Sequence, residues 1–144
     1  MRIAIGSDHG GFELKSKLIN HFKEIDFVDV GCYDKSSVDY PDFAFKVGEK
    51  IQNNEVDFGI VICSTGIGIS IAANKVRGVR CALVTSLMQA RLTRCHNNSN
   101  CLALGAFVTT FEEAKEIVAT FISTDFEGDR HLRRINKIKD YEER

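Results

Sequence analysis

A short stretch in the middle of the chain holds the residues best suited to chemistry. The apolar run Phe58 to Ile62 leads into Cys63-Ser64-Thr65-Gly66-Ile67-Gly68, and a helix-compatible apolar segment follows. This pattern predicts a buried strand, a tight loop and a helix start, with the thiol at the carboxyl end of the strand. Loop amides and a helix N-terminus attract negative charge, and they favour the thiolate form of a nearby cysteine. The stretch therefore predicts a site that makes or holds an anion, with Cys63 as base or nucleophile.

Further polar residues follow two other predicted strands. Ser7-Asp8-His9-Gly10-Gly11 comes after an apolar run at residues 2–6, and Asp39-Tyr40-Pro41 lies in the loop beyond residues 27–30. Ligands of parallel α/β sheets bind beyond the carboxyl ends of the strands, so these residues are expected to join Cys63. His96-Asn97 precedes the next apolar run, at residues 101–104, and reaches that edge only if its loop folds back.

Structural roles for the same residues stay open. Cys63 also suits a small buried apolar position, and Ser64 and Thr65 suit a helix N-cap. Asp8-His9 also suits a turn, and His96 suits a helix C-terminus. Arg130 and Arg134, four residues apart on one helix face, fit either a solvated surface or a phosphate clamp.

Length and composition narrow the class of protein. The 144 residues, 44% hydrophobic and 27% charged, predict one domain spanning 1–144. A net charge of −1 without a long basic run argues against a nucleic-acid or membrane surface, and the first apolar run is too short for a signal or membrane segment. Five cysteines without C-x-x-C spacing predict free thiols in a cytoplasmic protein. No metal site is expected, because Cys95-His96 are neighbours that cannot easily share one ion.

The apolar runs alternate with amphipathic stretches along the whole chain. Strands are predicted at residues 2–6, 27–30, 57–62, 80–84 and 101–104. Helices are predicted over 11–24, from Pro41, after the glycine loop, after Thr85 or Ser86, after the capping box of Thr110 and Glu113, and in a basic tail with Leu132, Ile135 and Ile138 on one side. Such alternation predicts a three-layer α/β/α Rossmann-like sandwich with a five-stranded parallel sheet, although it leaves the strand order open. The Gly66-Ile67-Gly68 loop is no dinucleotide motif, since it lacks the third glycine and follows the third strand, and no P-loop is present.

With these residues assembled, the chain resembles the ribose-5-phosphate isomerase B family, in the wider group of galactose-6-phosphate and allose-6-phosphate isomerases. The resemblance covers nearly the whole chain. It rests on five ordered motifs: Gly6 to Phe12, Asp39-Tyr40-Pro41, Ile62 to Lys75, Arg94-Cys95-His96-Asn97, and Gly128-Asp129-Arg130-His131 with Arg134.

The resemblance implies conversion of ribose 5-phosphate to ribulose 5-phosphate through a cis-enediol, without metal or organic cofactor. It assigns catalytic roles to four residues: Cys63 as base, Thr65 in proton relay, and His96 with Asp8 in ring opening. Substrate binding falls to the loop amides of Ser64, Thr65, Gly66, Ile67 and Gly68, to Asn97 and Tyr40 at the sugar, and to His9, Arg130 and Arg134 at the phosphate. It also implies a homodimer or homotetramer in which the tail arginines reach the partner's site.

Two positions depart from the family's pattern, and two other functions stay open. Ser64 stands where many relatives have glycine, and Phe107 stands where many have an arginine that supports the phosphate. A hexose phosphate such as allose 6-phosphate or galactose 6-phosphate is the first alternative substrate. A non-catalytic, flavodoxin-like protein that binds a phosphorylated ligand is the second alternative. A thiol redox protein is disfavoured because Cys63 has no resolving cysteine two or three residues away.

Overall fold

In the computed structural model, which describes residues 1–144, five parallel strands form one sheet in the order β2-β1-β3-β5-β4. The strands are β1 (Arg2–Ser7), β2 (Asp26–Gly31), β3 (Phe58–Cys63), β4 (Cys81–Leu83) and β5 (Cys101–Gly105). The predicted parallel sheet is confirmed, and the structure supplies its order. In this order, β2 lies on one side of β1, and β3, β5 and β4 lie on the other side. The chain therefore reverses its direction across the sheet after β2. The carboxyl ends of β1 and β3 therefore form the switch point where such sheets bind ligands.

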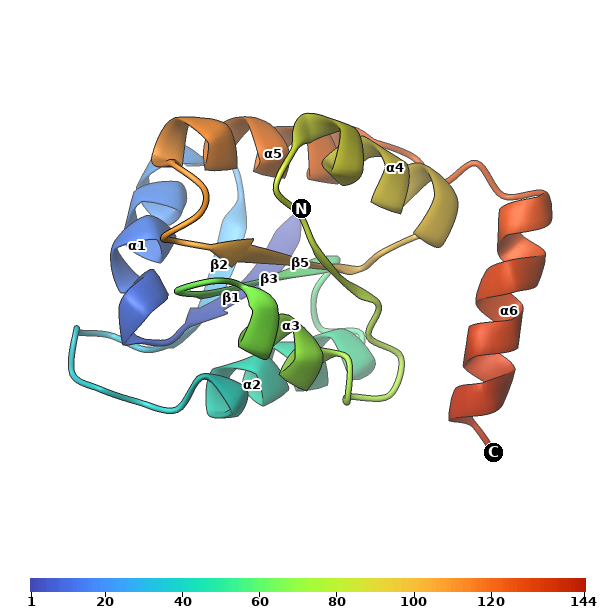
Figure 1. Cartoon of the computed structure of the whole chain (residues 1–144), viewed down its shortest axis with the longest axis horizontal. Coiled ribbons are helices and arrows are strands. Elements are labelled where there is room, and N and C mark those ends of the chain that lie inside the picture. Colours follow the sequence, from blue (N-terminus) through green and yellow to red (C-terminus); the bar gives the residue numbers. More distant parts are fainter.

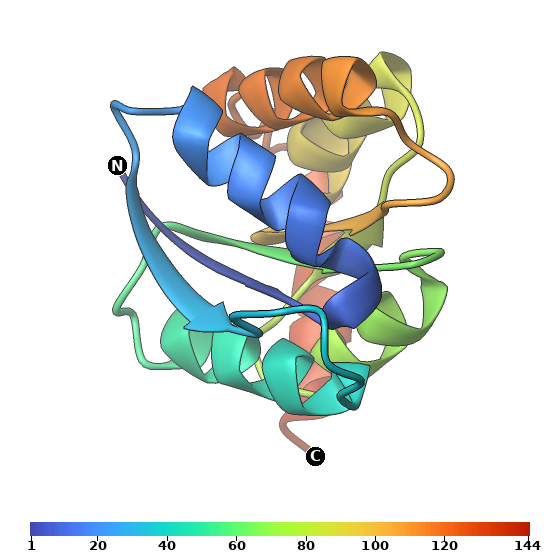
Figure 2. The same cartoon turned by 90° about the vertical axis from the view of Figure 1, so that its left-hand side faces the viewer.

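Helices cover both faces of the sheet and produce the three predicted layers (Figures 1 and 2). One face carries α1 (Phe12–His21), α4 (Leu87–Asn97) and α5 (Phe111–Ser123), and the other carries α2 (Tyr40–Gln52) and α3 (Ile67–Ala73). Alternate residues of each strand serve opposite cores, as the pleat requires: Ile3 and Ile5 pack under α1, whereas Ala4 packs under α2. None of the helices is long and apolar enough to cross a membrane.

The local signals for helix ends hold with small shifts. The Thr110 side chain accepts a hydrogen bond from the Glu113 amide at 3.2 Å, which completes the predicted capping box, and Ser86 accepts one from the Gln89 amide at 3.2 Å. The helix expected over 11–24 starts after a 3₁₀ turn, η1 (His9–Gly11), and ends at His21. It ends there because Phe22 leaves the helical conformation.

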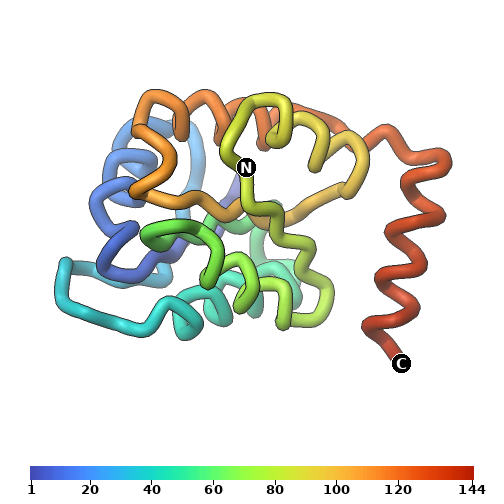
Figure 3. The backbone as a smooth tube through the Cα atoms, viewed as in Figure 1, coloured from blue at the N-terminus to red at the C-terminus, as the bar shows by residue number.

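The last helix, α6 (Arg130–Glu142), stands beside the body of the molecule rather than in a layer (Figures 1 and 3). Its buried side chains are those of His131 and Ile135. Leu132 and Ile138, which the sequence places on the same side as Ile135, are instead 48% and 58% exposed. In a single chain, the helix thus leaves apolar surface uncovered.

Candidate active site

Cys63 lies at the carboxyl end of β3, where the sequence places it. Its side chain is buried, and the Gly66 amide donates a hydrogen bond to its Sγ at 3.2 Å. Gly66 has φ of +78°, and a Cβ there would stand 2.6 Å from Leu83 Cδ1, so the turn requires glycine. This tight turn brings a backbone donor back onto the sulfur.

The loop after Cys63 offers further backbone donors. The Ile67 amide donates to Thr65 Oγ1 at 3.2 Å, whereas the amides of Ser64, Thr65 and Gly68 have no acceptor in the protein. Unpaired amides are usual at the start of a helix such as α3. Together with the helix dipole they form a place for an oxyanion next to the thiol.

Asp8 and His9 lie beside this loop. Asp8 is buried and accepts a hydrogen bond from the Gly11 amide at 3.1 Å, so its carboxylate caps η1. His9 is exposed, and its Nδ1 accepts from the Val38 amide at 3.2 Å, which places the ring proton on Nε2 and leaves that donor available. The two loops pack closely, since a Cβ on Gly10 would stand 2.4 Å from Ser64 Oγ.

Tyr40, the first residue of α2, also reaches the loop. A Cβ added to Gly68 would lie 2.7–2.9 Å from the outer atoms of the Tyr40 ring, so the ring rests on this glycine. The structure therefore brings together one group of predicted site residues at the carboxyl edge of the sheet. We call this group the thiol cluster: Asp8, His9, Tyr40 and Cys63 to Gly68.

The remaining predicted residues lie at the opposite edge. His96 is in the last turn of α4, which runs antiparallel to the strands, and the chain then enters the amino end of β5. In Figure 1 this end of α4 points to α6, whereas the β5 arrow points away from it. The fold-back of the loop required for His96 to reach the carboxyl edge does not occur. Within one chain, His96 and Asn97 are separated from Cys63 and Asp8.

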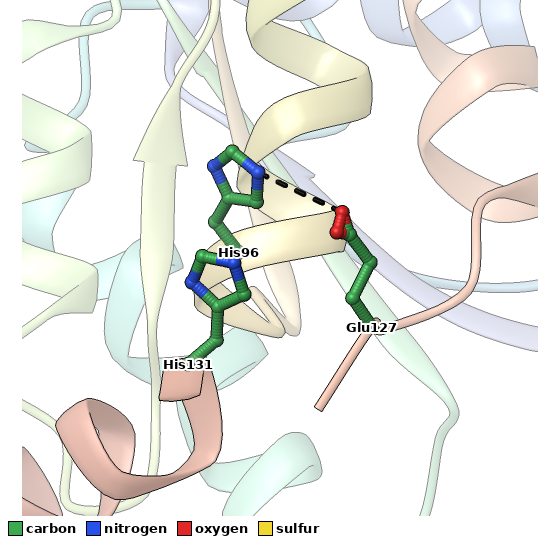
Figure 4. Close-up of side chains that lie close together, drawn as sticks. All are labelled: His96, Glu127 and His131. Carbon is green, nitrogen blue, oxygen red and sulfur yellow. Dashed lines mark ion pairs between the residues drawn. The ribbon is translucent and has the colours of Figure 1, made fainter. Parts of the chain in front are cut away.

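His96 instead belongs to a group built with α6, which we call the imidazole cluster: His96, Asn97, Glu127, Arg130, His131 and Arg134. The rings of His96 and His131 stack with centroids 4.3 Å apart and planes 13° apart, and His96 Nε2 lies 3.8 Å from Glu127 Oε1 (Figure 4). Asn97, Arg130 and Arg134 are exposed. Burial, followed by the charges of Arg130 and His96, lowers the pKa of His131.

Glu127 and His131 were missed as functional candidates in the sequence. His131 stands within the motif Gly128-Asp129-Arg130-His131, where only the arginines drew attention because of their charge. Glu127 carries no local signal, since its relation to His96 arises from the path of the chain between α5 and α6. Both become visible only once α6 is placed against α4.

The other four cysteines lie outside the thiol cluster, and all five are free thiols. Cys101 is paired with Cys81 across β5 and β4. Contact with the Cys81 side chain, together with burial, raises the pKa of Cys101 well above its usual range. A thiol in that state is a poor base at neutral pH.

Comparison with known proteins places this chain in a family. The model for Ribose/Galactose Isomerase matches residues 3–138. The chain belongs to the ribose/galactose isomerase family. Within the family it is 41% identical to ribose-5-phosphate isomerase B of Escherichia coli, over 99% of this chain and 97% of that protein.

Solved structures of family members share the fold. Ribose-5-phosphate isomerase B of Clostridium thermocellum is 48% identical, with a TM-score of 0.97 over 99% of this chain and 98% of that one. The enzyme of Mycoplasma genitalium, solved with bound ribulose-5-phosphate, is 46% identical, with a TM-score of 0.93 over 99% and 96%. The resemblance read from the five motifs is thereby confirmed.

The two departures from the family's pattern both lie at the thiol cluster. The Phe107 amide donates to the Ser64 carbonyl at 2.9 Å, and the Phe107 side chain is 79% exposed. An aromatic ring thus projects beside the loop that follows Cys63. Ser64 itself is partly buried and lies against Gly10.

Proposed function

We propose that this protein interconverts ribose 5-phosphate and ribulose 5-phosphate as an aldose–ketose isomerase. The observation that carries the proposal is the contact of the Gly66 amide with Cys63 Sγ, inside a loop whose Ser64, Thr65 and Gly68 amides have no acceptor in the protein. Membership of the family and the M. genitalium relative that binds ribulose-5-phosphate support the same substrate.

Proton transfer between C2 and C1 is assigned to Cys63. The thiolate takes the proton from C2 of the open-chain aldose, and the electron pair moves through the new C1–C2 double bond onto O1. The amides of Ser64 to Gly68 stabilise the enediolate oxygen, and Thr65 passes a proton between O2 and O1. Return of the proton from the thiol to C1 leaves a carbonyl at C2, which completes the ketose.

Ring opening requires a second acid–base group, and the geometry bears on where that group comes from. His96 and Cys63 lie at opposite edges of one chain, so a single copy does not bring them to one substrate. We propose that two copies pair so that His96 of the partner subunit, acting with Asp8, opens the sugar ring over the thiol cluster. Each subunit then supplies one half of each site.

The same pairing assigns the binding residues. His9 meets the phosphate from the subunit that carries Cys63, and Arg130 and Arg134 meet it from the other, since both are exposed beside His96 in the imidazole cluster. Tyr40 and Asn97 contact the sugar hydroxyls from the two sides. A homodimer is sufficient for this arrangement, and a homotetramer would contain the same pair twice.

Uncovered apolar side chains support the pairing. Ile67 and Ile71 on α3, beside the thiol cluster, are 53% and 57% exposed, and Leu132 and Ile138 on α6 are similarly open. These surfaces lie on the two elements that flank the two half-sites. A second copy placed over them would bury both at once.

A hexose phosphate is the second candidate substrate, and Phe107 is the observation that favours it. An exposed ring at the rim, in place of a cation, changes the contacts available to the far end of the substrate. The chemistry at Cys63 would be unchanged.

Turnover of three substrates tests the proposal: ribose 5-phosphate, allose 6-phosphate and galactose 6-phosphate, each with EDTA present and in D₂O. The expected result is preference for ribose 5-phosphate, with deuterium at C1 of the ketose product. Preference for a hexose phosphate would keep the mechanism and change the substrate. Tight binding of a sugar phosphate without turnover or deuterium exchange would instead support the non-catalytic alternative.

A further inference from the structure

The Nε2 atom of His131 stands out among the buried polar atoms. It is the one buried side-chain nitrogen or oxygen without a hydrogen-bond partner, on a residue that is 5% exposed. An unpaired buried polar group destabilises the folded chain, so such an atom calls for a ligand or a function. Two other side chains with electron-pair donors lie beside it, those of His96 and Glu127 (Figure 4).

The three residues present the donor set of a transition-metal site. One donor atom of each, two imidazole nitrogens and a carboxylate oxygen, lies within 4.8 Å of the others. Two histidines and a carboxylate form a common ligand set for Zn²⁺ and chemically similar cations, with a fourth position left for water.

Separate elements hold the three ligands in place. His96 is fixed in the last turn of α4, and the Glu127 amide donates to the Cys95 carbonyl at 3.1 Å, which ties the segment before α6 to that turn. The His131 amide donates to the Gly128 carbonyl at 3.0 Å at the start of α6. Thirty residues lie between His96 and Glu127 in the sequence, so no local spacing pattern indicates the site.

We propose that His96, Glu127 and His131 bind one borderline divalent cation, such as Zn²⁺ or Co²⁺. The stacked rings are almost parallel, and two parallel rings cannot both direct a lone pair at one ion. Binding therefore turns the ring of His96, whose side chain is 36% exposed, while the buried His131 stays in place. Glu127 offsets part of the repulsion from Arg130 and Arg134.

The site would regulate turnover, and this consequence rests on the proposed function. A cation held by His96 occupies the nitrogen that opens the sugar ring, so zinc-like ions act as reversible inhibitors that EDTA removes. The ion is not a cofactor of the reaction under this proposal.

Co²⁺ titration of the EDTA-stripped full chain tests the site directly, because visible absorption reports coordination and separates nitrogen and oxygen ligands from thiolates. The variants are His131→Ala, Glu127→Gln and the control His21→Ala, an exposed histidine on α1. We expect one Co²⁺ per chain, with no thiolate-to-cobalt charge-transfer band. Loss of even an outer partner of a metal ligand costs roughly 10–100-fold in affinity, so His131→Ala should weaken binding by at least about tenfold, and Glu127→Gln should weaken it in the same direction.

The outcomes separate this proposal from the proposed function. No saturable binding, a thiolate band, or equal affinity in His131→Ala and His21→Ala would overturn the site; circular dichroism checks that each variant folds. Binding lost in both variants and kept in His21→Ala supports it. If Co²⁺ binds in this way but leaves turnover unchanged, the site stands, and the ring-opening role of His96 and the inhibition fail.

Discussion

The two clusters are built in different ways. The thiol cluster is held by backbone: the carboxyl ends of β1 and β3, the turn at Gly66 and the start of α3 fix the loop, and the sulfur is buried. The imidazole cluster is held by the ends of two helices, and most of its polar side chains are open to solvent. Under the proposed function, the loop of the thiol cluster stabilises an anion within a single chain, whereas the imidazole cluster supplies acid–base and cationic groups.

Under the proposed function, the two clusters supply different parts of the reaction. A proton abstraction needs a rigid base and oxyanion donors, which the switch point of a parallel sheet provides. Phosphate capture and ring opening need long or rotatable side chains, which suit an exposed helix end. Under the proposed function, pairing of two copies joins the thiol cluster of one to the imidazole cluster of the other.

The largest loss of turnover should come from a change in the thiol cluster. Cys63→Ala removes the base, and general-base catalysis contributes roughly 10²–10⁴-fold, so kcat should fall by that factor. Steady-state turnover of ribose 5-phosphate measures it, with Cys81→Ala as the matched control because that thiol lies outside both clusters. Equal losses in the two variants would mean that Cys63 is only a structural thiol.

A smaller loss of turnover should follow removal of His96, the proposed acid–base group of the imidazole cluster. His96→Ala should lower kcat by about 10²-fold, the lower end of the range for acid–base groups, because sugar rings also open slowly without help. His21→Ala is the control. Presenting an open-chain substrate analogue should restore much of the His96→Ala rate, and a loss that persists with this analogue would contradict the ring-opening role.

Substrate affinity should depend on the tail. Arg134→Ala removes a charge-assisted contact of about 1.5–3 kcal/mol, which corresponds to roughly a 10- to 150-fold rise in KM. Arg144→Ala, at the far end of the chain, should leave KM near the wild-type value. An unchanged KM in Arg134→Ala at low ionic strength would remove this arginine from the phosphate site.

The last prediction concerns stability rather than turnover, at the turn that shapes the thiol cluster. Gly66→Ala forces a side chain into the left-handed region and against Leu83, so unfolding free energy should fall by about 1–2 kcal/mol from the backbone and about 1–3 kcal/mol more from overpacking. Gly78→Ala has a similar φ of +87° but open space around it, and should show the backbone part alone. Urea denaturation compares the two. Equal losses would contradict the close packing at Gly66.

Much of the thiol cluster could be predicted from the sequence, because its signals are local. A strand, a glycine turn and a helix start are adjacent in the chain, so Cys63 to Gly68 and Asp8-His9 could be placed at strand ends from their neighbours. The caps at Ser86 and Thr110 followed from residues three positions away. Strand order could not be predicted, since it depends on which long-range pairings compete best.

The imidazole cluster was harder to predict, because its residues come together through long-range packing rather than through local signals. The position of His96 depends on the direction of α4 relative to β5, and helices that follow parallel strands must run back to the amino edge. That rule places His96 away from Cys63, yet the motif suggested one site. Glu127 and His131 join His96 through the path of residues 124–129, which carries no pattern of its own.

Activity of mixed oligomers tests the central claim, that each site draws on two subunits, most directly. Cys63→Ala and His96→Ala chains, each with strongly reduced turnover alone, are coexpressed with different tags and purified as a mixture. If sites are shared, half of the pairs are mixed and each has one intact site, so about one quarter of wild-type turnover should return. Turnover that stays at the level of the separate variants, in mixtures shown by both tags to contain hybrid oligomers, would contradict the shared site.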